Sequence, residues 1–537
     1  MYRLCLGILA AGFFCLTCVA DEQLDSKAVR DAAEIYQKAL QEVIKEAEPS
    51  IACVLVSRSD VYKKIFHDEP PADNPGKLGG FDRSRADVPM LPSRGRGMRG
   101  FRRDSSTPQD PLKKYDLGDK DTVPELYGSG VVVEPPQGSR ELLILTSYHL
   151  IRDATKIYVR LPAPGEQSKG SYADIHAADP RSDLAVLRLS DTSIGPLRPL
   201  KRGDAATLRK GSFVVSLANL YAGSSSGASA TAAHGIVSNL LRPREFDTQR
   251  ALGAPQQFED STQPKPLYLV ETLIQTDAPL NSGCSGGALV NLRGELVGLT
   301  TPRATLGGSD RAGGYAMPIN KAMERIIQKL CQGEEVAYGY LGIRSEKDRT
   351  GRMRITHVLP GSPAQAAGLQ SGYTVVSING ERVYDNDDIY LKISTLLAGT
   401  TARLEIGTSQ DVTPQSYNAK LLKSYTAGKI IAATRPAAVR GLRVDYTSVL
   451  QSRQPQANNP WQPREQPLQS GVLVCELQPG SKAAAHLRLN DVITHMKIDD
   501  RFEVVTTPAE FYRLAAKVPA NQALELNVLN SEPVIIP

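Results

Sequence analysis

A serine inside a glycine-rich heptapeptide is the residue whose surroundings best suit covalent chemistry. Ser285 lies in the segment N-S-G-C-S-G-G, residues 281–287. A nucleophilic serine needs an exposed hydroxyl and backbone N–H groups arranged around the oxyanion that develops on its target. Gly283, Gly286 and Gly287 permit the tight backbone that a Cβ would obstruct. A glycine-rich hairpin turn is the alternative interpretation of this segment.

A histidine and an aspartate, each beside an apolar run, can complete a site around Ser285. His149 follows the run L-I-L-T-S-Y, residues 143–148, and Asp183 directly precedes L-A-V at 184–186. Each alone also fits a structural role, as a strand-end histidine or a strand-capping aspartate. Together they occur in the order His, Asp, Ser, which chymotrypsin-like proteases share. In such a site the histidine takes the serine proton and the aspartate orients the histidine.

The elements that must position these residues are predicted to be short strands. From residue 126 to residue 301, β-rich runs follow one another at close spacing, with turn signals and no regular helices between them. This pattern predicts an antiparallel barrel or sandwich. Residues 50–57 predict a strand before it, and residues 320–330 predict a helix that closes the region. Residues 25–48 predict an amphipathic helix, which either packs on its own domain or makes oligomer contacts.

The tail of the chain repeats one module. Residues 355–383 and 472–501 each contain an apolar strand, then Pro-Gly-Ser, an alanine-rich short helix, a second strand and a turn. Five features matched in order predict two copies of one domain. Residues 427–436 and the Gln- and Pro-rich residues 451–469 predict linkers or loops.

Several segments look like those of the HtrA/DegP family of trypsin-like serine proteases. They are T-S-Y-H-L at 146–150, S-D-L-A-V at 182–186, T-D-A-P-L-N-S-G-C-S-G-G from residue 276, G-Y-A-M-P-I-N at 314–320 and G-Y-L-G-I at 339–343. With the two repeats, the resemblance covers most of residues 50–537. It implies a mainly β chain: a chymotrypsin-like double β-barrel protease domain followed by two PDZ domains, which are small α+β barrels.

The resemblance also implies the site and the domain boundaries. It implies the catalytic triad His149, Asp183 and Ser285, an oxyanion hole from the N–H groups of Gly283 and Ser285, and neither a metal ion nor an organic cofactor. The expected divisions are a signal peptide at 1–20, an N-terminal helix at 21–48, a protease domain at 49–335 with a disordered insertion at 60–124, a first PDZ domain at 336–425 and a second at 438–537.

PDZ domains add an extended peptide to a sheet edge and capture its terminal carboxylate with backbone N–H groups. By resemblance, Tyr340, Leu341, Gly342 and Ile343 form the carboxylate-binding loop of the first module, which predicts that it binds peptide C-termini. Residues 441–444 are the candidate loop of the second module. For that module, ligand binding and a structural or assembly role both remain open.

The chain also departs from the family pattern. Cys284 stands where the family commonly has Asn, and Ala288 where it often has Pro. Cys284 is interpreted as a tolerated small residue, with a redox effect as the alternative. The segment around Pro279 and Leu280 carries no acid, so we expect cleavage after small or medium apolar residues rather than after Lys or Arg. Glycine-rich loops at 219–233 and 302–313 are expected to govern activity.

Composition and the first residues bound the remaining possibilities. The chain has 537 residues and a net charge of +5, which does not indicate a nucleic-acid partner. Arg3, an apolar stretch over residues 4–16 and the small residues before Asp21 predict a signal peptide cleaved near Ala20. Four cysteines remain after cleavage, in no CxxC pair, and are interpreted as buried free thiols. The arginine- and glycine-rich run at 93–103 is interpreted as a solvated insertion.

Three functional hypotheses follow. The first is an exported, periplasmic serine endopeptidase that cleaves unfolded or damaged polypeptides as a trimer or a multiple of one. A secreted or membrane-associated location is the alternative compartment. The second is a chaperone or scaffold whose protease fold no longer cleaves. The third is a regulatory protease with one dedicated substrate.

Overall fold

The computed structural model describes residues 26–58, 126–134, 143–161, 170–191, 198–219, 229–242, 267–280, 283–301, 314–407, 413–426, 430–453, 467–519 and 521–537. The expected signal peptide, the insertion at 60–124 and most of the two glycine-rich loops lie outside these residues. Within them, no helix is both long and apolar enough to cross a membrane.

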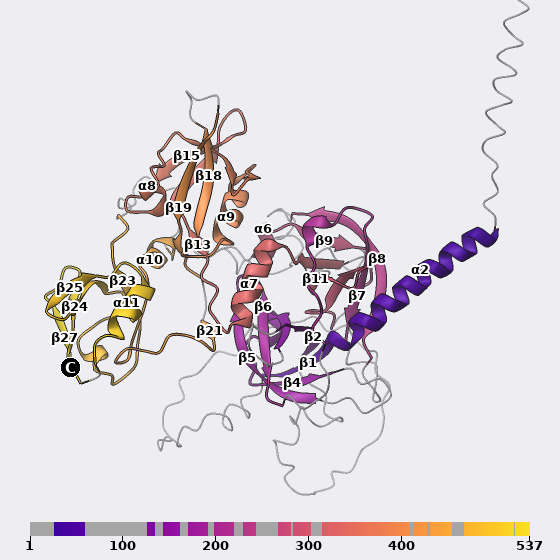
Figure 1. The fold of residues 1–537 in the computed structure, drawn as a ribbon, viewed down its shortest axis with the longest axis horizontal. Coiled ribbons are helices and arrows are strands. Elements are labelled where there is room, and N and C mark those ends of the chain that lie inside the picture. The colour runs from indigo at the N-terminus through magenta and orange to yellow at the C-terminus, as the bar shows by residue number, and fades with distance from the viewer. Residues whose placement is uncertain are drawn as a thin grey trace, which may run out of the picture.

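Two closed β-barrels form the first half of the structure (Figure 1). The strands of the first barrel are β1 (Ile51–Ser57), β2 (Leu126–Val133), β3 (Leu143–Ser147), β4 (Lys156–Arg160), β5 (Gly170–Asp179) and β6 (Leu184–Leu189), in the order β5-β4-β1-β2-β3-β6, with β6 pairing back to β5. Those of the second are β7 (Phe213–Ala218), β8 (Thr231–Leu241), β9 (Leu273–Thr276), β10 (Ala288–Asn291), β11 (Leu296–Thr301) and β12 (Gly314–Pro318). The chymotrypsin-like double barrel is therefore confirmed.

Strands β2 and β3 of the first barrel are apolar on both faces where they pair, because each face meets a core. In β2, Val132 belongs to the cluster inside the first barrel, whereas Val131 and Val133 belong to the cluster shared with the second barrel and α7. In β3, Ile144 and Leu145 divide in the same way. Side chains alternate between the faces of a strand, so a continuous apolar run is what a doubly buried strand requires.

Short helices lie around the barrels. They are α4 (Tyr148–Ile151), α6 (Leu267–Val270) and α7 (Lys321–Cys331). Asn320 caps α7 by accepting hydrogen bonds from the N–H groups of Ala322 and Met323, each at 3.0 Å. This helix packs Met323, Ile326, Ile327 and Leu330 into the core that joins the barrels.

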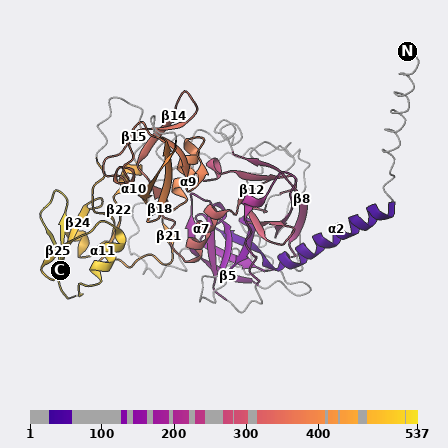
Figure 2. The ribbon, with the colours of Figure 1, turned by 45° about the horizontal axis from the view of Figure 1, so that its top comes forward.

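The N-terminal helix α2 (Ser26–Ala47) extends away from the second barrel (Figures 1 and 2). Its last turns are anchored by the buried side chains of Val43 and Ala47, and Tyr36 contacts Phe213 with a ring-centroid distance of 5.0 Å. Ile35, one residue before Tyr36, is 69% exposed. The helix therefore keeps an apolar side chain in solvent on its outer half.

Two further sheets follow, and they have the same topology. The first has the order β14 (Ile343–Lys347), β15 (Met353–Val358), β16 (Thr374–Ile378), β18 (Thr401–Gly407), β19 (Gln415–Lys420), with β17 (Glu381–Arg382) paired to β16. The second has the order β22 (Leu442–Tyr446), β23 (Val472–Leu477), β24 (Val492–Ile498), β26 (Leu524–Val528), β27 (Val534–Ile536), with β25 (Arg501–Val504) paired to β24. The internal repeat of the sequence is thus a repeat of structure.

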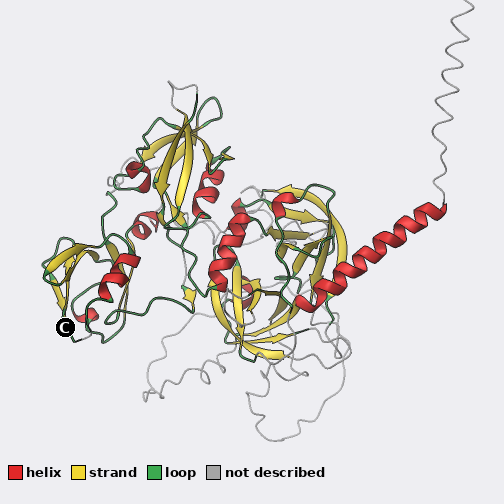
Figure 3. Cartoon of the chain, in the orientation of Figure 1, coloured by secondary structure: helices red, strands yellow, loops and turns green. Residues whose placement is uncertain are grey.

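Each repeat carries helices beside its sheet (Figure 3). They are α8 (Pro363–Ala366) and α9 (Asn386–Ser394) in the first repeat, and α10 (Ser448–Arg453) and α11 (Pro508–Ala515) in the second. A small pair, β13 (Gly339–Tyr340) and β20 (Leu422–Lys423), closes the base of the first repeat.

The connection between the repeats differs from the sequence prediction. Residues 427–436 were expected to be a linker or loop, but Ile431–Ala432 form strand β21, which pairs with Ala177 and Ala178 of β5. The N–H of Ala433 also donates to the carbonyl of His176 at 2.9 Å. A two-residue strand leaves no periodic pattern, so only its neighbours in space reveal it.

Candidate active site

His149 and Asp183 form a hydrogen-bonded pair where β3 ends and β6 begins. The carboxylate Oδ2 of Asp183 lies 2.7 Å from His149 Nδ1, and Oδ1 accepts a 2.9 Å hydrogen bond from the His149 backbone N–H. The side chain of Asp183 is only 14% exposed, whereas that of His149 is 36% exposed. The carboxylate therefore fixes an imidazole whose far side remains accessible.

Strand register brings these two residues together. β3 and β6 are antiparallel neighbours in which Ser147 pairs with Leu184. His149 follows β3 and Asp183 precedes β6, so both leave the sheet at one edge. Asp183 has φ +59°, in the left-handed region that non-glycine residues seldom adopt. Its carbonyl accepts the N–H of Tyr148 at 2.8 Å, which holds this uncommon backbone in place.

Arg58 is a further positioning group, and the sequence analysis missed it. The residue follows β1, and its guanidinium donates to the carbonyls of His149 at 3.2 Å and Arg152 at 2.8 Å. These carbonyls belong to the last turn of α4 and its C-cap, where a cation is favourable. An arginine at the edge of an uncharacterised insertion gives no signal in a single sequence.

The glycine-rich segment packs against β2 and β3, next to His149. A Cβ on Gly286 would lie 2.3 Å from the Ser129 carbonyl oxygen and 2.6 Å from Thr146 Oγ1, and Gly286 has φ +81°. It would also lie 3.2 Å from the Ser147 nitrogen, two residues before His149. Glycine is therefore required here both by backbone conformation and by space.

Gly128 of β2 is the second contact that joins the histidine and serine segments. A Cβ at this position would lie 2.5 Å from Leu150 Cδ2 and 3.0 Å from the Ser285 carbonyl oxygen. Leu150 directly follows His149. The residues on either side of the candidate catalytic groups thus converge on one strand, which places His149, Asp183 and Ser285 in one region.

The carbonyls of Gly283, Cys284 and Ser285 in the serine turn are held by hydrogen bonds. Ser129 Oγ donates to the Gly283 carbonyl at 2.9 Å, and the Ser129 N–H donates to the Ser285 carbonyl at 2.8 Å. The Cys284 carbonyl accepts the Gly287 N–H at 2.8 Å. In a trans peptide the C=O and the next N–H point in opposite directions, so the Ser285 N–H faces away from this contact. The Gly283 N–H belongs to a peptide plane shared with Ser282, outside the described residues.

The segment before the serine turn contains one acidic residue, Asp277, which contacts β8. Asp277 Oδ1 accepts the N–H of Ile236 in β8 at 2.7 Å. Leu280 instead lies against the start of β12, because a Cβ on Gly314 would come within 2.1 Å of its Cδ1. The group facing β12 is therefore an apolar side chain.

A buried polar cluster lies just before Asp183. Asp179 accepts the Ser182 N–H at 2.9 Å and a hydrogen bond from the Tyr338 hydroxyl. Burial raises the pKa of the Asp179 carboxyl, although both hydrogen bonds oppose this shift. The Arg181 guanidinium stacks on the Tyr338 ring, 4.0 Å from its centroid. These contacts join the segment of Asp183 to the connection that follows α7.

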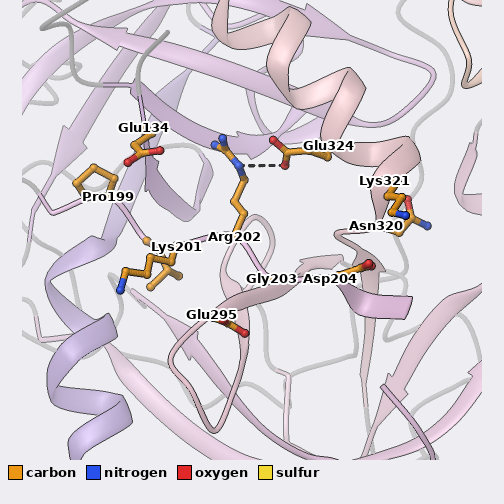
Figure 4. A pocket seen from close by; sticks show the side chains of 11 residues that line it. Glu134, Pro199, Lys201, Arg202, Gly203, Asp204, Glu295, Asn320, Lys321 and Glu324 are labelled. Atoms are coloured by element: carbon orange, nitrogen blue, oxygen red, sulfur yellow. Dashed lines mark ion pairs between the residues drawn. The ribbon is translucent and has the colours of Figure 1, made fainter. Parts of the chain in front are cut away.

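The described pocket of about 510 Å³ does not include the candidate catalytic residues (Figure 4). Its lining includes Lys201, Arg202, Glu295 and Glu324, from the connection between the barrels, the β10–β11 turn and α7. Arg202 Nε lies 3.0 Å from Glu324 Oε2, which ties that connection to the helix. Mixed charge and an internal ion pair fit a structural junction.

Among the described residues, the four cysteines outside the expected signal peptide form no disulfide. Cys53, Cys284 and Cys331 are buried, as expected, but Cys475 is exposed, and the expectation that all four are buried was wrong for that residue. Burial raises the pKa of Cys53 to about 12, so this thiol stays protonated. Within the described ranges, no three His, Cys, Asp or Glu side chains are grouped to hold a metal ion.

The candidate peptide-binding residues lie directly before and at the start of an edge strand. Tyr340, Leu341 and Gly342 lead into β14, which begins at Ile343 and has a sheet neighbour only on the β15 side among the described strands. Gly342 has φ +82°, and its carbonyl accepts the Leu359 N–H at 3.0 Å. The loop is thus fixed beside an unpaired strand edge.

Comparison with known proteins gives two family matches. Residues 128–299, which include His149, Asp183 and Ser285, match the model described as a trypsin-like peptidase domain. Residues 354–406 match a PDZ domain.

Curated relatives align with more of the chain than the two family models do. A "Probable periplasmic serine endoprotease DegP-like" from Pseudomonas fluorescens is 28% identical over 434 residues, covering 78% of this chain and 80% of the relative. The "Periplasmic pH-dependent serine endoprotease DegQ" of Escherichia coli is 29% identical over 433 residues, covering 78% and 82%. The solved structure "Crystal structure of the serine endoprotease from Yersinia pestis" is 20% identical, covers 71% of this chain and 97% of that one, and has a TM-score of 0.39.

Proposed function

We propose that the chain is a periplasmic serine endopeptidase of the HtrA/DegP family that uses His149, Asp183 and Ser285 as its catalytic triad. The observation that carries this proposal is that Asp183 contacts His149 twice. Its Oδ2 lies 2.7 Å from Nδ1 of the ring, and its Oδ1 accepts the backbone N–H at 2.9 Å. This pair lies beside the turn that carries Ser285, because Gly286 packs against the strand that leads to His149.

The proposed mechanism follows from this arrangement. Ser285 Oγ attacks the peptide carbonyl while His149 Nε2 takes its proton and later donates it to the leaving amine. Asp183 keeps the proton of the neutral imidazole on Nδ1 and stabilises the imidazolium. The Ser285 N–H, directed away from the carbonyl contact of Cys284, and the Gly283 N–H stabilise the oxyanion. One such donor is worth about 3 to 4 kcal/mol in the transition state.

The substrates we propose are unfolded or damaged polypeptides. An extended chain is the form that fits an active site between two barrels and can add to an edge strand. The first PDZ repeat would bind peptide C-termini: the N–H groups of residues 341–343 capture the carboxylate, and β14 pairs with the peptide backbone. Its free edge and the fixed loop at Gly342 support this role.

The proposed location and assembly rest on other observations. The DegP-like and DegQ relatives are named periplasmic, and residues 1–20 have the pattern of a signal peptide. We propose a homotrimer or a multiple of one. The outer half of α2, with the exposed Ile35, would contribute to contacts between subunits.

Digestion of an unfolded model protein tests the proposal. The mature chain should cleave reduced, alkylated protein, and a Ser285→Ala chain should not. If neither cleaves, at several temperatures and with added C-terminal peptides, the protease fold acts as a chaperone or scaffold instead. If both cleave, the nucleophile is not Ser285.

A further inference from the structure

The two PDZ repeats position their candidate carboxylate loops by the same contact. A Cβ on Gly342 would lie 2.4 Å from Ser362 Cβ, and one on Gly441 would lie 2.2 Å from Ser481 Cβ. Gly342 and Gly441 also have nearly the same φ, +82° and +86°. Gly441 is thus the counterpart of Gly342.

This alignment corrects the position of the second loop. Residues 439–442 correspond to residues 340–343, whereas residues 443 and 444, which the sequence analysis also assigned to the loop, lie further along β22. Arg440 therefore stands where the first repeat has Leu341.

The loop of the second repeat is closed by its own hydrogen bonds. The N–H of Val439 donates to the Leu442 carbonyl at 2.8 Å, and the N–H of Leu442 donates to the Val439 carbonyl at 2.9 Å. Among the described contacts of the first repeat, no such bond joins Tyr340 and Ile343. The Leu442 N–H, which corresponds to a proposed carboxylate donor, is therefore already used.

The strand edge of the second repeat is capped by a side chain. The Val444 N–H of β22 donates to the Tyr512 hydroxyl of α11 at 3.4 Å. Tyr390 holds the equivalent position in α9, five residues after its N-cap Asp385, as Tyr512 is five after Thr507. Tyr390, however, stacks on Arg181 of the protease half, 4.7 Å from the guanidinium carbon. In the second repeat, the tyrosine hydroxyl instead occupies a backbone site that an added peptide would use.

The next residue of β22 binds the first repeat. Lys423 Nζ lies 2.6 Å from Asp445 Oδ2 and 2.6 Å from Glu335 Oε1. The Lys423 side chain is 6% exposed, and one cation placed between two carboxylates is well compensated for its burial. Lys423 belongs to the first repeat, Asp445 to the second, and Glu335 to the connection from α7.

Two hydrogen bonds reinforce this junction. Ser448 Oγ donates to the Lys423 carbonyl at 2.6 Å, and the Leu468 N–H donates to the Pro360 carbonyl at 2.8 Å. Pro360 follows Leu359, whose N–H holds the Gly342 carbonyl. The second repeat thus packs against the loop that supports the first repeat's carboxylate site.

We propose that the peptide-recognition edge of the second PDZ repeat has become the docking surface for Lys423 and the first repeat, so that the chain captures one peptide C-terminus, at the first repeat alone. The part that concerns capture rests on the proposed function of the first repeat. The part that concerns docking does not.

Photo-crosslinking tests the capture. The probe is a peptide with an apolar free C-terminus and a photoreactive residue at the third position from the end, added to the full-length Ser285→Ala chain. We expect crosslinks within residues 339–347, lost when the peptide is amidated, and none within 438–446. Crosslinks within 438–446 overturn the proposal. The absence of crosslinks at both sites refutes peptide capture by the first repeat, and with it the capture half of this proposal.

Hydrogen exchange tests the docking independently of any peptide. Lys423→Met and Asp445→Asn should each raise amide exchange of β22 roughly tenfold, the effect of losing about one net hydrogen bond. Tyr512→Phe should raise exchange at Val444 but not at Leu442. Lys420→Met, at an exposed position of β19, is the matched control and should leave the amide exchange of β22, including that of Val444, unchanged. Unchanged exchange of β22 in both Lys423→Met and Asp445→Asn contradicts the docking.

Discussion

Asp183 holds His149 through two oxygens that serve different purposes. Oδ2 contacts the ring at 2.7 Å, and Oδ1 accepts the backbone N–H at 2.9 Å. The first contact sets the tautomer and ring plane, and the second fixes the residue that bears the ring. Because the aspartate is largely buried while the histidine remains partly exposed, the pair is suited to orient a base toward a substrate.

Replacing Asp183 by Asn should reduce kcat by about 10⁴-fold, because an amide can hold the ring in the wrong tautomer. Steady-state cleavage of an unfolded substrate measures this effect. The thermal midpoint should fall only slightly, since the substitution preserves shape and still accepts the backbone bond.

Asp153→Asn is the matched control. Asp153 also has a left-handed backbone, with φ +60°, but its side chain is 82% exposed and lies outside the proposed triad. The activity of the Asp153→Asn variant should equal that of the native chain. Equal losses in the two variants would show that the Asp183 effect is a matter of folding.

Arg58→Met should lower kcat on the order of tenfold with little change in KM, because α4 loses the donor that fixes the carbonyl of His149. Arg152→Met is the control, since the Arg152 side chain is 61% exposed and its role in the contact is through its backbone carbonyl. Equal activity of Arg58→Met and the native chain would remove Arg58 from the positioning groups.

Cleavage should follow small or medium apolar residues. Leu280 contacts Gly314, whereas Asp277 Oδ1 accepts the Ile236 N–H of β8, so the side chain that this segment places against β12 is apolar. A peptide library read by mass spectrometry measures this preference. A profile dominated by Lys or Arg before the cleaved bond contradicts the prediction.

Cys475 should react with iodoacetamide in a strongly pH-dependent way. Although the Cys475 side chain is exposed, partial desolvation of its thiol and the nearby Asp445 raise its pKa to about 11. Only the thiolate reacts, so its fraction, and hence the rate, should rise about tenfold per pH unit between pH 7 and pH 10. Mass spectrometry of the modified peptide gives the rate, and Cys475→Ser is the control. A rate that is high and flat near pH 7 would indicate an activated thiolate.

The sequence predicts much of this fold because its signals are local. Apolar runs bounded by turns predict the barrel strands, and the double burial of residues such as Val131 and Val132 explains why those runs do not alternate. The repeat was detected because each copy keeps Pro-Gly-Ser after its apolar strand. The structure confirms the double barrel and the two similar sheets.

What the sequence could not predict depends on contacts between distant segments. Arg58, Lys423 and Tyr512 act through partners tens of residues away or in another repeat, and none lies in a recognisable motif. Strand β21 forms by pairing with β5, which lies more than 250 residues earlier in the chain. The sequence left open whether the second repeat binds a peptide. That question depends on the hydrogen bonds of β22, which no residue pattern contains.

Labelling with a fluorophosphonate tests the central claim most directly. An activated serine displaces fluoride and forms a serine–phosphorus bond, whereas ordinary serines do not react. We predict that mass spectrometry of the native chain finds the adduct on Ser285 alone, and that His149→Ala reduces labelling by at least about 10³-fold. An adduct elsewhere, or labelling of Ser285 that is unaffected by loss of His149, would contradict the proposed triad.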